Sequence, residues 1–195
     1  MTAQPRHFFK SCMAASMLAL MAGVAQAESA FVDELRFGGT WAQPAFLDGN
    51  HPEKDQFAIN GEVLFAPLNL DGRADAPNDF VNALLSPRLH LGGTVNFDNN
   101  GTSLVYSGLT WHFGLTENLF LETSFGGSLN NGERNYTANR APLGATLLFR
   151  ESIALGYRVS PQMNVILQID HNSNADLADR NRGLTATHLK IGYKF

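Results

Sequence analysis

The end of the chain, TATHLKIGYKF (residues 185–195), alternates between apolar and polar side chains. Successive side chains of a β-strand point to opposite faces, so this period of two predicts a strand with two unlike faces. The apolar face would carry Leu189, Ile191, Tyr193 and Phe195, and the opposite face His188, Lys190 and Lys194. Such a strand must lie between an apolar and a polar environment.

The same alternation recurs in seven earlier segments, separated by stretches rich in turn residues, and no helical period of comparable length competes with it. We predict an all-β fold of eight antiparallel strands, and the even number suits a closed barrel. The earlier segments are Glu34–Trp41, Ile59–Pro67, Arg88–Phe97, Ser103–Phe113, Leu119–Leu129, Leu143–Val159 and Asn164–Ser173.

The apolar faces of these segments are too bulky for the inside of a small barrel, because eight strands enclose little space. We therefore predict that the apolar side chains face lipid, as in an outer-membrane β-barrel, around a packed polar interior. A mean hydropathy of −0.13 fits this arrangement, since half of each strand points inward. The predicted interior charges are Glu34, Arg36, Glu62, Arg88, Glu122, Arg150 and Lys190.

The N-terminus has the pattern of a cleavable secretory signal. Basic residues precede an apolar run from Cys12 to Val24, and Ala25-Gln26-Ala27 is a small-residue cleavage site. A retained membrane anchor would need a longer apolar run. We predict a signal peptide over residues 1–27 and a single β-barrel domain over residues 28–195, exported and then inserted in the outer membrane.

Composition excludes several classes of function. Acidic residues outnumber basic ones, 18 to 14, so nucleic acid is not an expected partner. No zinc spacing, phosphate-binding glycine loop or dinucleotide fingerprint occurs, so neither a metal nor another cofactor is expected. The single cysteine, Cys12, lies in the signal, which leaves the mature chain without disulfides.

One connection departs from the pattern of short periplasmic turns. The stretch from Asn69 to Ser86 is long, and its run from Phe80 to Leu85 predicts a short interfacial helix. The other predicted periplasmic connections, around Thr116 and Pro161, are short. The final aromatic residue, Phe195, resembles the ending of bacterial outer-membrane barrels.

A candidate catalytic pair lies where the seventh segment meets a polar loop. His171 and Ser173 share the apolar face, roughly 6 to 7 Å apart along the strand. A serine hydroxyl becomes a nucleophile when a base within hydrogen-bond reach takes its proton, and a third group normally orients the base. The alternative is a histidine of the aromatic girdle beside an incidental serine.

The turn at Ser160-Pro161-Gln162 supplies a candidate for the third group. If Pro161 is its centre, Glu151 lies opposite His171 on the lipid side, where a carboxylate needs a partner. A bulge that turns Glu151 inward is an equal alternative. Asn174 follows the pair and is a candidate oxyanion donor, through its side chain or its backbone N–H, or an ordinary turn residue.

The run HNSNA (residues 171–175), followed by NRGL (181–184) and the ending IGYKF (191–195), resembles the lipid A 3-O-deacylase family (PagL-type, grouped with acyloxyacyl hydrolases). The resemblance implies an outer-membrane esterase that removes the 3-linked hydroxyacyl chain from lipid A. Its partners would be lipopolysaccharide in the outer leaflet and membrane lipids, and a homodimer is left open. By position, His171 is the general base, Ser173 the nucleophile and Asn174 an oxyanion contributor.

Two positions depart from the family pattern. Asp176 stands where the family has glycine, and Thr185 stands at the position of the acidic triad member. Thr185 can accept a hydrogen bond from the imidazole, more weakly than a carboxylate, and Glu151 is the tentative replacement acid. The alternative function is a non-catalytic PagL-like barrel with an envelope-structural or surface-binding role. A different lipid-active enzyme, such as a phospholipase or an acyltransferase, is a further alternative.

Overall fold

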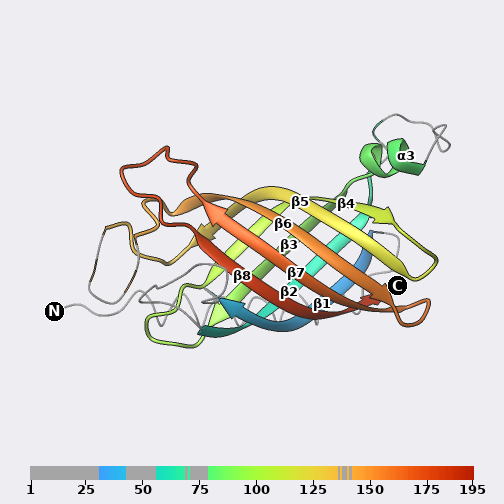
Figure 1. Cartoon of the computed structure of the whole chain (residues 1–195), viewed down its shortest axis with the longest axis horizontal. Helices are drawn as coiled ribbons and strands as arrows, with labels where there is room; N and C mark the ends of the chain where they lie inside the picture. The colour runs from blue at the N-terminus through green and yellow to red at the C-terminus, as the bar shows by residue number, and fades with distance from the viewer. Residues whose placement is uncertain are drawn as a thin grey trace.

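The structure, a computed structural model, describes residues 31–42, 56–68, 70, 79–135, 137, 140 and 142–195. Eight antiparallel strands follow one another around a closed barrel (Figure 1), so the predicted fold is confirmed. The strands are β1 (Val32–Ala42), β2 (Gln56–Pro67), β3 (Arg88–Asn96), β4 (Leu104–Gly114), β5 (Leu119–Asn130), β6 (Leu147–Arg158), β7 (Met163–Ser173) and β8 (Leu184–Lys194). The predicted signal peptide lies outside the described residues and stays a prediction.

The two faces of each strand are distributed as the alternation predicts. On β8, Leu189 is 61% exposed and its neighbour Lys190 is 0% exposed. Large apolar side chains therefore form the outer surface, and charged ones fill the interior. The barrel closes where β1 pairs with β8, from Glu34 opposite Lys194 to Ala42 opposite Ala186. Such a surface suits a hydrocarbon solvent and not water.

The interior is a network of charges and not a pore. The Arg36 guanidinium donates to Glu34 at 2.8 Å and to Glu122 at 2.7 Å, and lies 3.7 Å from Glu62. Lys190 pairs with Glu62 at 3.2 Å. All these side chains are buried, so each charge depends on its partners for stabilisation.

Replacement of Arg36 by Met should leave buried carboxylates without their shared partner. We expect the free energy of unfolding to fall by about 3–5 kcal/mol, the range found when one partner of a buried ion pair is removed. Urea unfolding in lipid vesicles measures this loss. Lys194→Met is the matched control, because Lys194 is half-exposed and lies 3.6 Å from Asp33. Equal stabilities of the two variants would contradict this role of the network.

The prediction for the sixth strand was wrong at its start. The strand begins at Leu147 and not at Leu143, because Gly144 has a φ of +76° that breaks the extended backbone. Leu143 instead packs in the buried cluster of Leu104, Tyr106, Leu148 and Leu184. Leu143 therefore packs against residues at the end of the barrel where β7 ends and β8 begins.

The predicted short helix is present as α3 (Asp79–Leu85), at the end of the barrel where the chain terminates (Figure 1). The indole N–H of Trp111 donates to the Leu84 carbonyl at 3.1 Å, and the Phe80 and Phe113 rings stack at 5.5 Å. Both partners on β4 face outward. Within the described ranges, no helix is long and apolar enough to cross a membrane.

Candidate active site

His171 and Ser173 lie on the outward face of β7, at the end of the barrel opposite to the C-terminus. Strand register sets their neighbours. His171 stands opposite Glu151 of β6 and opposite Thr185 of β8, and Ser173 stands opposite Phe149. The predicted pairing of Glu151 with His171 is therefore confirmed, and Glu151 points outward, not into the barrel. β6, β7 and β8 run side by side in Figure 1.

The imidazole of His171 is held by Thr185. Nδ1 of His171 and Oγ1 of Thr185 lie 2.9 Å apart. When Nδ1 carries the hydrogen and donates it to the hydroxyl, Nε2 is left unprotonated and able to accept a proton. No hydrogen bond joins Glu151 to His171 in the part of the chain that the structure describes. Among the described residues, Thr185 is the one whose side chain hydrogen-bonds to His171.

Gly183 packs against the same imidazole. A Cβ atom at this position would lie 2.6 Å from Cε1 and 3.0 Å from Nε2 of His171. The φ of Gly183 is +74°, a conformation that L-residues with a side chain rarely adopt. The close contact with the imidazole and the positive φ both require glycine at position 183. The Gly183 backbone therefore limits where the His171 ring can lie.

Ser173 is half-buried beside a cavity of about 390 Å³. The Ser173 hydroxyl makes no hydrogen bond to His171 among the described residues, so the pair is near but not yet aligned for proton transfer. Catalytic hydrogen bonds of this kind often tighten when substrate is bound. The cavity is lined by Phe125, Phe149, Glu151, His171, Ser173 and Ala175.

The backbone after Ser173 is strained. Ala175 and Asp176 have φ values of 53° and 61°, both in the left-handed region, and the Leu177 N–H donates to the Asn174 carbonyl at 3.1 Å. Non-glycine residues in this region each cost of order 1–3 kcal/mol, and they cluster at functional sites. The backbone N–H groups of Ala175 and Asp176 have no acceptor among the described residues, so they are available donors beside the serine.

Asn174 is engaged in holding loops together. Its buried side-chain amide donates to the carbonyls of Leu143, at 2.9 Å, and Arg180. Its backbone N–H donates to Oδ1 of Asn181 at 3.1 Å. Both routes by which Asn174 was expected to bind an oxyanion are therefore occupied by protein acceptors in this structure.

Asn181 is a residue that sequence reasoning did not single out as part of the site. Besides accepting from Asn174, its side-chain amide donates to the Asp176 carboxylate at 3.0 Å. Asn181 thus supports both ends of the strained turn. Its place two residues before Gly183, in the NRGL run, was the only signal in the sequence.

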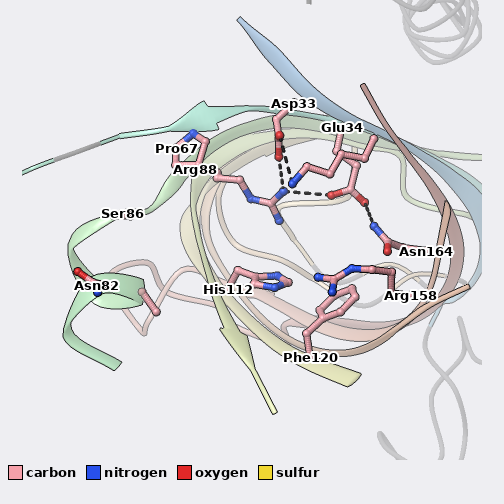
Figure 2. A pocket seen from close by; sticks show the side chains of 12 residues that line it. Asp33, Glu34, Pro67, Asn82, Ser86, Arg88, His112, Phe120, Arg158 and Asn164 are labelled. Atoms are coloured by element: carbon pink, nitrogen blue, oxygen red, sulfur yellow. Dashed lines mark hydrogen bonds and ion pairs between the residues drawn. The ribbon is translucent and has the colours of Figure 1, made fainter. Parts of the chain in front are cut away.

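The described residues contain no cluster of three or more His, Cys, Asp or Glu side chains placed to hold a metal ion. A second cavity, of about 290 Å³, lies at the opposite mouth of the barrel. Figure 2 shows Arg88 between Asp33 and Glu34 there, with ion-pair distances of 2.8 and 3.1 Å. Asn164 donates to Glu34 at 3.2 Å. This cavity is part of the interior charge network and does not contact His171.

The fold and this site define a class: outer-membrane β-barrels with a histidine and a serine on the lipid-facing surface. Residues 82–194 match the sequence profile of the family described as "Lipid A 3-O-deacylase (PagL)". The chain belongs to this family.

The chain is similar to solved structures. The crystal structure of the outer membrane enzyme PagL has 16% sequence identity and a TM-score of 0.57, covering 85% of this chain and 100% of that chain. A de novo designed transmembrane β-barrel has 14% identity and a TM-score of 0.49, covering 87% of this chain and 98% of that chain. No curated protein sequence matches the chain.

Proposed function

We propose that this protein is a serine esterase of the outer membrane that hydrolyses the 3-O-linked hydroxyacyl ester of lipid A. The observation that carries the proposal is the outward-facing pair of His171, held by Thr185 at 2.9 Å, and Ser173, on one cavity in a chain of the deacylase family. Because the site faces lipid, a substrate in the outer leaflet can reach it laterally.

The reaction would begin with attack of Ser173 Oγ on the acyl carbonyl carbon. Nε2 of His171 takes the hydroxyl proton as general base, and the carbonyl oxygen becomes an oxyanion. The imidazolium then gives the proton to the glucosamine oxygen as the ester bond breaks, which leaves an acyl group on Ser173. Water, activated by His171, releases the 3-hydroxy fatty acid and restores the serine.

The oxyanion needs hydrogen-bond donors aimed at its position. We assign this role to the backbone N–H groups of Ala175 and Asp176, which have no acceptors among the described residues and follow the nucleophile directly. The strained left-handed turn is the feature that keeps these N–H groups out of ordinary backbone pairing. Asn174 acts by holding the turn to the loop at Leu143, as a positioning residue.

Thr185 orients the base without providing charge. A carboxylate at this position would also stabilise the imidazolium, so a threonine predicts a slower enzyme. Glu151 lies opposite His171 and makes no hydrogen bond to it within the described ranges.

We expect Thr185→Val to lower kcat by about tenfold, because the imidazole loses the one hydrogen-bond partner that it has among the described residues, and Glu151→Gln to lower kcat less. We expect Thr185→Glu to raise kcat by about tenfold or more. Initial rates of fatty acid release from lipopolysaccharide measure all three. If Glu151→Gln proved the more harmful change, the orienting role would belong to Glu151, as the sequence first indicated.

A non-catalytic barrel is the second candidate, favoured by the missing carboxylate at position 185 and by the missing hydrogen bond between Ser173 and His171. Mass spectrometry of lipid A after incubation with the folded protein separates the candidates. Loss of one 3-hydroxyacyl chain supports the deacylase, and an unchanged lipid A supports the non-catalytic barrel. Loss of a different acyl group would indicate another lipid-active enzyme.

A further inference from the structure

Another cavity, on the outer surface of the barrel, adjoins the cavity that holds Ser173 and His171. Its volume is about 400 Å³, and apart from Asn174 its lining residues are apolar. Phe125 and Phe149 line both cavities, so they form a shared wall, and their rings stack at 6.2 Å with an interplanar angle of 18°. We call this apolar cavity the acyl groove. Leu177, which is 78% exposed, and Ala178 border the acyl groove from the loop after Ser173.

The acyl groove lies directly across the sheet from the serine. Ser173 of β7 stands opposite Phe149 of β6, and Phe149 stands opposite Gly127 of β5. Two inter-strand spacings separate Ser173 from Gly127, which is about 10 Å. An extended chain attached at Ser173 would therefore cross Phe149 and reach Gly127.

Gly127 is not required by the backbone. Its φ is not in the left-handed region, and an added Cβ would meet only ordinary contacts, 3.6 Å from the Leu148 carbonyl oxygen and 3.7 Å from Leu147 Cδ1. The neighbouring Gly126 is different, because a Cβ there would collide with the backbone of Ser107 and Gly108. What the missing side chain at Gly127 provides is open space in the acyl groove.

We propose that the acyl groove binds the hydrocarbon tail of the 3-hydroxyacyl chain, and that Gly127 keeps the groove open for long chains. The occupant follows from continuity, since the groove shares its wall with the cavity that holds Ser173 and offers almost only apolar contacts. The assignment of the chain rests on the proposed function, but occupancy of the groove can be measured without hydrolysis.

The test is photocrosslinking with 3-hydroxytetradecanoic acid that carries a diazirine near its methyl end. Folded protein is labelled in detergent, and the labelled peptides are identified by mass spectrometry. We expect labelling concentrated on residues around Gly127, Leu147 and Leu177, and about tenfold weaker labelling there in Gly127→Leu. Leu129→Phe is the matched control, because it adds bulk on the same face of β5 outside both cavities.

Even labelling around the barrel, or labelling that Gly127→Leu does not change, would overturn the proposal. Deacylation of lipopolysaccharide is measured in parallel on the same proteins. Concentrated labelling without deacylation would retain the groove as a fatty-acyl site and reject the proposed function. Deacylation with even labelling would retain the function and reject the groove.

Discussion

His171→Gln is expected to lower the rate of lipid A deacylation by about 10³-fold or more. Glutamine fills a similar volume but cannot accept the proton of Ser173 and return it to the leaving oxygen. The loss should appear in kcat, because the general base acts in the transition state and contributes little to substrate binding. Initial rates of 3-hydroxy fatty acid release, measured by mass spectrometry, test this expectation.

The matched control is His112→Gln. His112 lies at the opposite mouth of the barrel, 3.0 Å from Glu122, and lines the cavity in Figure 2. This variant should retain its deacylation rate. Both proteins should show the heat-dependent electrophoretic shift of a folded barrel. A His171→Gln protein that stays folded and active would remove His171 from the mechanism.

Gly183→Ala is expected to lower the deacylation rate by about 10²-fold, the scale of loss for a small misplacement of a catalytic group. The new methyl group would lie 2.6 Å from Cε1 of His171, so the ring must move away from its position beside Thr185. The φ of +74° adds backbone strain of about 1–2 kcal/mol. Release rates and urea unfolding measure the two effects separately.

Gly39→Ala provides the comparison, since a Cβ at Gly39 would have nothing within 4 Å. Its rate and stability should match those of the parent protein. If Gly183→Ala also retained the parent rate, the position of the imidazole would not depend on this glycine, and the rigid placement of the base would be wrong.

The barrel could be predicted from the sequence because its signal is local. Period-two alternation fixes which side chains face lipid, and the short turn at Pro161 fixes the register of β6 against β7. Glu151 opposite His171 was obtained in this way and is confirmed. The outward direction of the apolar side chains could be inferred because the interior of an eight-stranded barrel is too small to hold them.

The loops could not be predicted, because their geometry depends on contacts between distant segments. Leu143 continues the apolar pattern of the sixth strand, yet it lies in a cluster formed with residues from β4, β6 and β8. The role of Asn174 is hidden for the same reason, since its amide contacts the carbonyls of Leu143 and Arg180. The left-handed turn at Ala175 and Asp176 carries no glycine to mark it.

The most direct test of the proposed function compares the parent protein with Ser173→Ala on intact lipopolysaccharide, with lipid A followed by mass spectrometry. The Ser173 hydroxyl makes no hydrogen bond within the described residues, and the backbone pairing of Ser173 with Phe149 does not depend on the side chain, so the alanine variant should fold normally. We expect the parent to remove one 3-hydroxyacyl chain and Ser173→Ala to leave lipid A unchanged. Equal removal by both folded proteins, or removal by neither, would contradict the assignment of Ser173 as the nucleophile of a lipid A deacylase.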